Sequence, residues 1–412
     1  MRFLLAAALC ICVAFPQAGR CQSVAEWHNV TAETGKIDNI PGLVALADAF
    51  PDSASVHLRL LNAYLGADDR ELALSEAIWL AERGYVFSDA SQDQILSLED
   101  DAGGVARLAK LFALNSKPIE QSSIAATVSV DAKLVEGIAL DPLDNSIIVT
   151  TVISRQIFGQ RKDGSWRLLP VESADSLSGI GFNPEMGDFW VASGDLGMTP
   201  AGRPQFHGLF RFKRGQPLEP DRFPAPEGGS PSDLTVGDDG RVFASDPLNG
   251  AIYQVNEASG TLSYLVAPGT FRSPQGLAVS EDGGLLYVSD YRWGIAIVDL
   301  QRRKISRLAA IAPMILDGID GLYRSGNRLI GIQNGMKPMR IVAIELSDDG
   351  IQAKRLDVLE RAHREWTEPL GGTIHDGALY YIATGQWDRY GRGGQSIEGK
   401  PQLPTQIRRL VF

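Results

Sequence analysis

The chain has 412 residues, of which 44% are hydrophobic and 22% are charged, a composition typical of a globular protein. Its formal net charge of −11 leaves no excess of Lys and Arg to neutralise phosphates, so we expect no nucleic-acid partner. A chain of this length exceeds one ordinary core unless a domain has a repeat architecture such as a barrel or a propeller. The 43 glycines favour an all-β fold with many tight turns.

The N-terminal segment carries one early arginine, an apolar run from Phe3 to Phe15, and then small and polar residues. The run is too short to span a bilayer, and it predicts a secretory signal peptide over residues 1–22. A buried N-terminal helix is the alternative. We therefore expect an exported protein, periplasmic or secreted, with no membrane span. Two of the three cysteines lie in the apolar run, so at most Cys21 could remain after cleavage and no internal disulfide is expected. Cys21 is a poor lipidation site because an arginine precedes it.

Residues 24–117 show the 3.6-residue period of helices, clearest in HLRLLNAYLGADDRELALSEAIWLAERG. The pattern predicts two helices separated by GADD, each with one apolar face; these faces comprise Leu58, Leu61, Tyr64 and Leu65, and Ala73, Ala77, Leu80 and Ala81. The pair resembles one tetratricopeptide unit, and AGGVARLAKLFAL predicts a further helix. With fewer than three repeats, the module is expected to rest against the rest of the chain as a cap. The alternative is a groove that docks a protein partner.

Residues 118–412 switch to the period of strands and contain a repeated phrase. The six copies are EGIALDPLDNSIIVTTV, SGIGFNPEMGDFWVASGD, SDLTVGDDGRVFASD, QGLAVSEDGGLLYVSD, DGLYRSGNRLIGIQN and GGTIHDGALYYIATG. Each has an apolar strand, a polar turn and a second strand, and all the turns but the first contain a glycine that can supply positive φ.

The residues that head the six phrases are Glu136, Ser178, Ser232, Gln275, Asp320 and Gly371. Six units of about four strands at this spacing predict a six-bladed β-propeller, so the fold class is mainly β with a small helical module in front. A β-sandwich is the alternative, but six recurrences of one phrase argue against it. Strands near Ser123–Val130 and Gln406–Phe412 are expected to complete one shared blade, which closes the ring.

The heading residues should ring one mouth of the axial channel, because the first strand of each blade runs along it. Glu136 and Asp320 would then lie close together, where two ionised carboxylates must take up a proton or share a cation. Oxygen donors from these residues and Gln275, with no nearby Cys or His, suit a hard cation such as Ca²⁺. The alternative is a solvated polar plug.

Two long loops, 193–208 and 384–405, should overhang the same mouth as a partial lid. They are rich in glycine and proline and carry His207, Trp387 and Tyr390, which we predict as walls of a substrate pocket.

The phrases PSDLTVGDDGRVFASD and SPQGLAVSEDGGLLYVSD, with the order of the heading residues, resemble the family of senescence marker protein, gluconolactonase and luciferin-regenerating enzyme. The resemblance covers roughly residues 125–412, and strictosidine synthase and paraoxonase are more distant relatives of the same propeller. It implies a divalent cation, often calcium, held by Glu136, Gln275 and Asp320, with Asp320 also activating water. It further implies that Ser232 lies near metal and substrate.

The chain departs from the family pattern at some of the residues that the resemblance assigns to the metal and the substrate. The family has Asn where this chain has Gln275 and Ser232, and the segment GGSPSD lacks the Arg that grips an acidic sugar in many members. The chain also has no G-x-S-x-G elbow, no H-E-x-x-H and no C-x-x-C, so a serine hydrolase and the common zinc sites are not expected.

The sequence therefore predicts an exported hydrolase of lactones or related esters that depends on a divalent cation. Asp320 is the predicted catalytic residue, and Ser232, His207 and Trp387 are the predicted substrate-binding residues. The alternative is a non-catalytic propeller that binds a protein or a ligand, since propellers serve both purposes.

Overall fold

The structure, a computed structural model, describes residues 25–183, 186–200, 202, 205–215 and 219–412. The predicted signal peptide and all three cysteines lie outside the described residues. Helices occupy the N-terminal part, and strands form the rest as six sheets. Among the described residues, no helix is both long enough and apolar enough to cross a membrane.

Five α-helices form the N-terminal module. They are α1 (Ile40–Ala49), α2 (Ala54–Gly66), α3 (Arg70–Glu82), α4 (Asp89–Leu96) and α5 (Ala102–Asn115), preceded by the 3₁₀ turn η1 (Thr34–Lys36). Each α-helix starts after an Asn, Ser or Asp whose side chain accepts a hydrogen bond from the amide three residues later. These caps satisfy amides that have no partner within the helix, which explains where the helices begin.

The predicted helix pair is present as α2 and α3, and the further predicted helix is α5. In α3 the expected alanines and Leu80 are buried. In α2 Leu61 and Tyr64 are buried as expected, whereas Leu58 and Leu65 are only partly buried. The helices are too few to establish a tetratricopeptide array, so that assignment stays a prediction.

The six sheets are the blades of a β-propeller. Blade 1 comprises β2 (Val135–Leu140), β3 (Ile147–Thr151), β4 (Ile157–Gln160) and β5 (Trp166–Leu169). Blade 2 comprises β6 (Ser176–Phe182), β7 (Phe189–Gly194), β8 (Gly208–Phe212) and β9 (Asp221–Pro224). Blade 3 comprises β10 (Leu234–Val236), β11 (Val242–Asp246), β12 (Ala251–Asn256) and β13 (Thr261–Val266).

The remaining blades follow in chain order. Blade 4 comprises β14 (Pro274–Val279), β15 (Leu285–Asp290), β16 (Gly294–Asp299) and β17 (Ile305–Arg307). Blade 5 comprises β19 (Gly321–Ser325), β20 (Arg328–Gln333), β21 (Arg340–Leu346) and β22 (Gln352–Arg361), with the short parallel β18 (Ala309–Ala310) at its edge. Blade 6 comprises β23 (Gly372–His375), β24 (Ala378–Ile382), β25 (Thr405–Val411) and β1 (Ser123–Val128). Two 3₁₀ turns, η2 (Trp387–Arg389) and η3 (Arg392–Gly394), lie between β24 and β25.

The first strands of the blades form the innermost ring. Each contacts the first strand of the next blade, from β2 through β6, β10, β14 and β19 to β23, and β23 contacts β2 again. The predicted closure is also confirmed, because β1 pairs antiparallel with β25, with Val128 opposite Thr405. The outermost strand of blade 6 therefore comes from the start of the propeller, and no blade is left open between the two ends.

The hairpin between the first two strands of each blade has at least one residue at positive φ. Glycine supplies it in five blades, at Gly187, Gly240, Gly283, Gly326 and Gly377. Blade 1 has no glycine in this turn, and Asn145 adopts φ 59° instead. Asn tolerates the left-handed conformation better than most residues, so the same turn forms without glycine.

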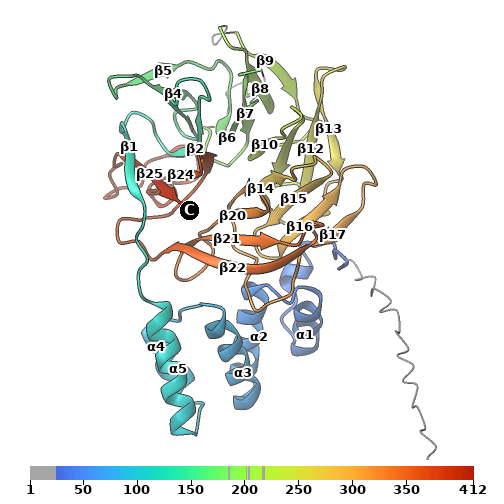
Figure 1. The fold of residues 1–412 in the computed structure, drawn as a ribbon, viewed down its shortest axis with the longest axis vertical. Helices are drawn as coiled ribbons and strands as arrows, with labels where there is room; N and C mark the ends of the chain where they lie inside the picture. Colours follow the sequence, from blue (N-terminus) through green and yellow to red (C-terminus); the bar gives the residue numbers. More distant parts are fainter. Residues whose placement is uncertain (1–24, 184–185, 201, 203–204, 216–218) are drawn as a thin grey trace, which may run out of the picture.

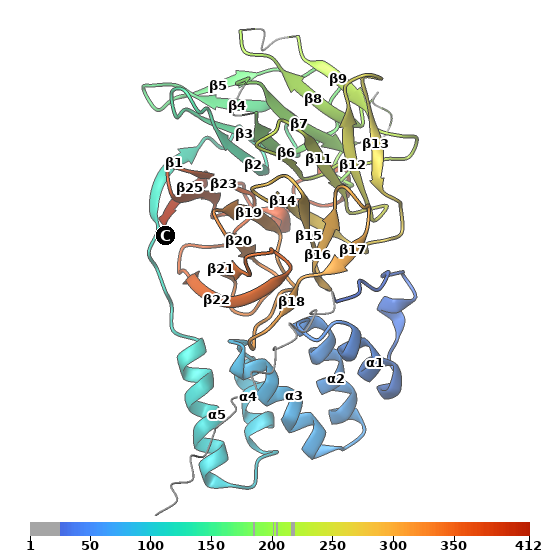
Figure 2. The ribbon, with the colours of Figure 1, turned by 45° about the vertical axis from the view of Figure 1, so that its right-hand side comes forward.

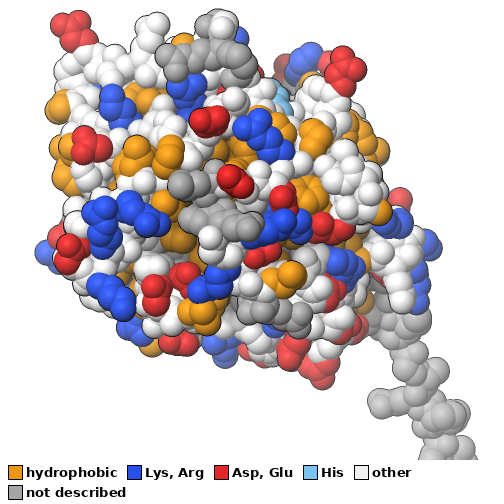
Figure 3. Space-filling model, turned by 90° about the horizontal axis from the view of Figure 1, so that it is seen from above, with side chains coloured by type: hydrophobic (Ala, Val, Ile, Leu, Met, Phe, Trp, Pro, Cys, Tyr) orange, Lys and Arg blue, Asp and Glu red, His pale blue; other side chains and the backbone are white. Residues whose placement is uncertain are grey.

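The helical module packs against blades 4 and 5 (Figures 1 and 2). The ring centroid of Phe50 lies 4.9 Å from that of Trp293, and Trp27 lies 5.3 Å from Phe271. Buried Asp317, before blade 5, accepts hydrogen bonds from the amides of Ala54 and Ser55 at 2.9 Å each. The module thus shares a core with the propeller. The side away from the helices shows charged and hydrophobic side chains interspersed (Figure 3).

Candidate active site

The six heading residues all line one narrow cavity of about 50 Å³ on the propeller axis. Each lies within the first three residues of an inner strand or one or two residues before it, and this position places it at the axis. The expectation of a ring is therefore met for Glu136, Ser178, Ser232, Gln275, Asp320 and Gly371.

A glycine follows the heading residue in five of the six blades. In blades 1, 2 and 4 the next blade approaches too closely for a side chain at this position. A Cβ at Gly137 would lie 2.1 Å from the carbonyl oxygen of Ser178, and one at Gly276 would lie 2.3 Å from the amide nitrogen of Leu322. Blade 3 is the exception, with Asp233 at this place. Its carboxylate accepts a hydrogen bond from the amide of Leu234 at 2.8 Å and lines the same axial cavity.

A wider cavity of about 270 Å³ lies at the mouth, next to the axial one. It is lined by Glu136, Leu196, Ser232, Pro247, Gln275, Tyr291, Asp320, Asn334, Glu368, Leu370 and Trp387. Leu196 and Trp387 come from the two long loops, so both loops reach the mouth as expected. Three carboxylates meet here, and none of the lining residues is Lys, Arg or His.

Two of the three carboxylates are held by hydrogen bonds from neighbouring side chains. The indole nitrogen of Trp387 donates to Oε2 of Glu136 at 2.9 Å. The amide nitrogen of Asn334 donates to Oδ2 of Asp320 at 2.8 Å, and the Tyr291 hydroxyl donates to Oδ1 of Asn334 at 2.7 Å. These contacts fix the orientation of both carboxylates without neutralising their charge.

Burial raises the pKa of every carboxyl group in the two cavities, and the charge of Asp320 raises the pKa of the other three further. The pKa of Glu136 lies well above its usual value, first because of burial and then because of Asp320. Burial raises the pKa of Asp320 to about 6, against the hydrogen bond from Asn334. The pKa values of Glu368 and Asp233 are raised to about 7, mainly by burial and further by Asp320. Such a group of acids binds protons at neutral pH unless a cation replaces them.

The donor set fits a hard divalent cation. Oε1 of Glu136, Oδ1 of Asp320 and Oε1 of Gln275 receive no hydrogen bond from any described residue, while Nε2 of Gln275 is engaged with Oγ of Ser273 at 3.0 Å. Oxygen-only ligands of this kind suit Ca²⁺. Within the described ranges no three His, Cys, Asp or Glu residues form a group that could hold a metal ion, so the mouth carboxylates do not form such a group by themselves.

Only some of the residues predicted to line the substrate pocket lie at the mouth. Ser232 and Trp387 line the mouth cavity, but His207 does not. Nε2 of His207 lies 2.8 Å from Oδ2 of buried Asp175, and this contact raises the pKa of the imidazole. Tyr390 is buried, and its hydroxyl donates to Oε1 of Gln402 at 2.6 Å, so it braces the loop.

Sequence reasoning missed the three polar or acidic residues Tyr291, Asn334 and Glu368 of the mouth, besides apolar lining residues such as Pro247 and Leu370. Tyr291 and Asn334 each directly follow the second strand of a blade, and Glu368 comes three residues before a heading residue. The ends of the second strands return to the same face as the starts of the first strands, and this rule could have identified Tyr291 and Asn334.

The fold and the mouth together define a six-bladed propeller with an acidic axial site. No protein-family model and no curated protein sequence matches the chain. Solved structures similar to it include a gluconolactonase of Xanthomonas campestris, with 17% identity over 71% of this chain and 95% of that chain and a TM-score of 0.47.

Two further similar structures are described as proteins other than gluconolactonases. A calcium-binding regucalcin of Agrobacterium tumefaciens is 16% identical over 70% of this chain and 93% of that chain, with a TM-score of 0.48. A virginiamycin B lyase of Staphylococcus aureus is 12% identical over 64% of this chain and 82% of that chain, with a TM-score of 0.47. Similarity at this level concerns the fold, so the chemistry of the site has to be argued from its own residues.

Proposed function

We propose that the protein is a hydrolase of lactones or related esters that depends on a divalent cation, most plainly Ca²⁺, at the mouth of the propeller. One observation carries the proposal. Glu136, Gln275 and Asp320 line one cavity, each with an oxygen that no described hydrogen-bond donor reaches. Burial raises the pKa of both carboxyl groups, and the charge of Asp320 raises the pKa of Glu136 further. The signal sequence proposed for residues 1–22 would export it.

Glu136, Gln275 and Asp320 are the residues that would hold the cation. When bound, a divalent cation supplies Lewis-acid polarisation of a carbonyl group. Asp320 accepts the proton of the attacking water at Oδ2, through the lone pair that the Asn334 hydrogen bond does not use, because Oδ1 is the oxygen that would hold the cation. The water adds to the acyl carbon, the ring C–O bond breaks, and the proton passes to the alkoxide as the hydroxy acid forms.

The other lining residues indicate what kind of substrate fits. Leu196, Leu370 and Trp387 provide apolar surface, and the Ser232 hydroxyl is available to a polar group. Because the mouth has three carboxylates and no Lys, Arg or His among its lining residues, one divalent cation leaves it without surplus positive charge. We therefore propose a neutral or cationic ester rather than an acidic sugar lactone. The negative charge of the mouth carboxylates also favours release of the anionic hydroxy acid, because like charges repel.

The test is calcium binding by titration calorimetry together with hydrolysis of a panel of lactones and aryl esters, with and without chelator. Matched esters with a neutral, a carboxylate-bearing and an ammonium-bearing group test the charge preference. Glu136→Gln and Asp320→Asn should lose both calcium binding and turnover. A protein that binds no calcium and hydrolyses none of the panel is instead the non-catalytic binding propeller.

A further inference from the structure

A second cavity, larger than the mouth, lies between blades 1 and 2. Its volume is about 630 Å³, within the range of roughly 300–1,000 Å³ that small-molecule sites occupy. It is lined by the turn between β2 and β3, the hairpin of β4 and β5, and residues of β6, β7 and the segment after β8. The proposed function does not use this cleft, since no heading residue lines it.

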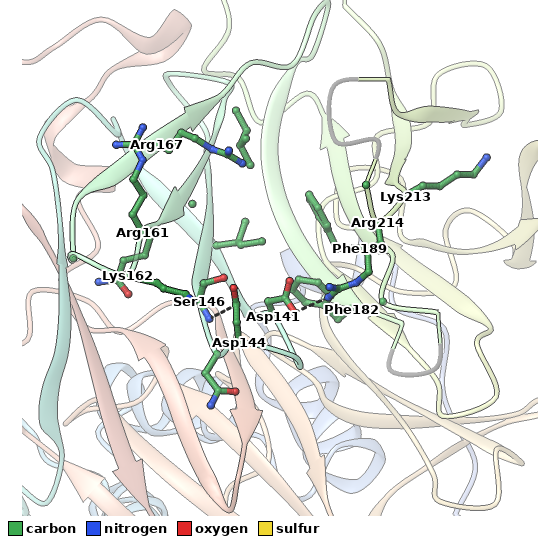
Figure 4. Close-up of a pocket in the computed structure, with 18 residues that line it drawn as sticks. Asp141, Asp144, Ser146, Arg161, Lys162, Arg167, Phe182, Phe189, Lys213 and Arg214 are labelled. Carbon is green, nitrogen blue, oxygen red and sulfur yellow. Dashed lines mark hydrogen bonds and ion pairs between the residues drawn. The ribbon is translucent and has the colours of Figure 1, made fainter.

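Positive charge gathers in this cleft although the chain as a whole is acidic. Arg161, Lys162, Arg167, Lys213 and Arg214 line it, against only Asp141 and Asp144. Figure 4 shows Arg161, Lys162 and Arg167 along one side, with Phe182, Phe189 and Arg214 along the other. The Lys213 side chain extends away from the centre of the cleft.

Two of these cations are already paired with carboxylates. Nη2 of Arg214 lies 2.8 Å from Oδ1 of Asp141, and Nζ of Lys213 lies 2.9 Å from Asp221 outside the cleft. The three cations of the β4–β5 hairpin differ from them. Arg161, Lys162 and Arg167 have no carboxylate at ion-pair distance in the part of the chain that the structure describes.

Below the cations the cleft has an apolar and rigid wall. Ile148, Leu169 and Phe189 are buried, and Phe182 is half-buried. The ring of Phe189 stacks on Phe212 with centroids 4.7 Å apart and lies 5.5 Å from Phe182. In the middle of β4, Gly159 leaves the wall open, because a Cβ there would meet only Leu169, at 3.8 Å.

We propose that this cleft is a binding site for a small amphipathic anion, a phosphate ester whose other part is an aromatic or apolar group. The guanidinium groups of Arg161 and Arg167 offer forked donors that match phosphate oxygens, with Lys162 as a further point charge. The apolar part of the ligand packs on Ile148, Leu169 and the two phenylalanines. The same chemistry exists in a phospholipid head group, so the test separates a soluble ligand from a membrane.

The probe is phenyl phosphate, titrated calorimetrically into the full chain after passage over a chelating resin, so that a cation at the mouth contributes nothing. We expect one site per chain. Arg161→Ala and Arg167→Ala should each weaken binding about tenfold, as the loss of one charge-assisted contact predicts. Arg167→Lys should recover part of the loss. Arg355→Ala, which removes an exposed charge from β22, is the matched control and should change nothing.

Two further measurements test the apolar wall and the source of the ligand. Gly159→Leu fills the wall without removing charge and should weaken phenyl phosphate more than inorganic phosphate. Unfolding temperatures close to that of the wild type establish that the variants fold. Absence of phenyl phosphate binding at low ionic strength overturns the proposal, as does equal binding by wild type and an Arg161→Ala, Arg167→Ala double variant. If the protein binds only phosphatidylcholine vesicles that contain phosphatidic acid, and this binding depends on the arginines, the proposal of a soluble ligand is wrong.

Discussion

The indole nitrogen of Trp387 lies 2.9 Å from Oε2 of Glu136, although the two residues are 251 positions apart in the chain. The loop after β24 therefore folds back over the mouth and orients the carboxylate that heads blade 1. The other oxygen of Glu136 receives no hydrogen bond from a described residue, so it is the oxygen that would face the proposed cation. This contact predicts a measurable role for a loop residue in cation binding.

Trp387→Phe removes the donor and keeps an aromatic ring in its place. A hydrogen bond to a charged group contributes about 1.5–3 kcal/mol, so we expect calcium affinity to fall about tenfold or more. Titration calorimetry of the wild type and the variant measures it. Tyr390→Phe, which removes a hydroxyl from the same loop but outside the mouth, is the control. Equal calcium affinity in wild type and Trp387→Phe would show that the contact does not orient the ligand.

The raised pKa values of the mouth carboxyl groups predict how stability depends on pH without metal. The folded pKa of Asp320 is about 6 and that of Glu368 about 7, whereas in an unfolded chain both groups titrate near pH 4. Between these values the folded state binds more protons than the unfolded state, so the free energy of unfolding falls as pH rises. The metal-free protein should melt at a lower temperature at about pH 8 than at about pH 5.

Calcium should counteract this loss of stability at high pH, because a bound cation neutralises the carboxylates in place of protons. We expect calcium to raise the melting temperature more at about pH 8 than at about pH 5, as measured by thermal unfolding at both pH values with and without the ion. Glu136→Gln should abolish most of the difference. A calcium effect that is the same at both pH values would contradict the coupling between protons and cation.

Asn334 is predicted to influence the pKa of Asp320, the proposed catalytic carboxylate. Its amide donates to Oδ2 of Asp320, and this hydrogen bond lowers the pKa of Asp320 against the effect of burial. Asn334→Leu removes the donor, so the pKa of Asp320 should rise. The acid limb of kcat/KM for ester hydrolysis should then move to higher pH, by about one unit.

Tyr291→Phe is the matched control for that experiment. It removes the hydroxyl that donates to Asn334 but leaves the amide on Asp320, so the pH profile should move little. An unchanged acid limb in Asn334→Leu would show that Asp320 is not the group that titrates in the reaction.

The sequence was sufficient for the architecture because the inner strand, the turn and the second strand recur in every blade. Even the blade without a turn glycine obeyed the pattern, through Asn145. The shared sixth blade followed from the need to close the ring, as β1 and β25 show.

The sequence was less informative about the walls of the site, since a loop carries no repeat that fixes where its side chains lie. Trp387 and His207 were equal candidates in sequence, but only Trp387 reaches the mouth, because Asp175 holds His207. Glu368 lies three residues before the heading residue of blade 6, outside the repeated phrase. The repeat therefore gave no reason to select Glu368.

The close approach of the blades predicts that the inner glycines cannot be replaced. Gly137→Ala would place a Cβ 2.1 Å from the carbonyl oxygen of Ser178, and neither backbone can move without shifting a blade. We expect a loss of roughly 2–4 kcal/mol in the free energy of unfolding, or a failure to fold. Gly66→Ala near the end of α2, where nothing lies within 4 Å, should be neutral or stabilising. Urea denaturation of both variants gives the comparison, and equal stability would mean that the blades are less tightly joined than described.

Asp317 predicts how firmly the helical module is held. Its carboxylate accepts hydrogen bonds from the amides of Ala54 and Ser55 and from the Ser53 hydroxyl, so a residue of the propeller caps the first turn of α2. Asp317→Ala leaves these buried donors without an acceptor, and we expect a loss of roughly 2–4 kcal/mol of local stability. Hydrogen exchange should then accelerate in the first turns of α2 and at the contact of Phe50 with Trp293, while the inner strands of blades 1 and 2 stay protected.

Asp101→Ala is the matched control, because it removes a helix cap within the module, at α5, that has no contact with the propeller. It should cost about 1 kcal/mol and accelerate exchange in α5 alone. If Asp317→Ala leaves exchange in α2 unchanged, the module is held by its apolar contacts and the capping carboxylate contributes little. If exchange rises across all five helices at once, the module undocks as a unit, and the cap at Asp317 is what fixes it to the propeller.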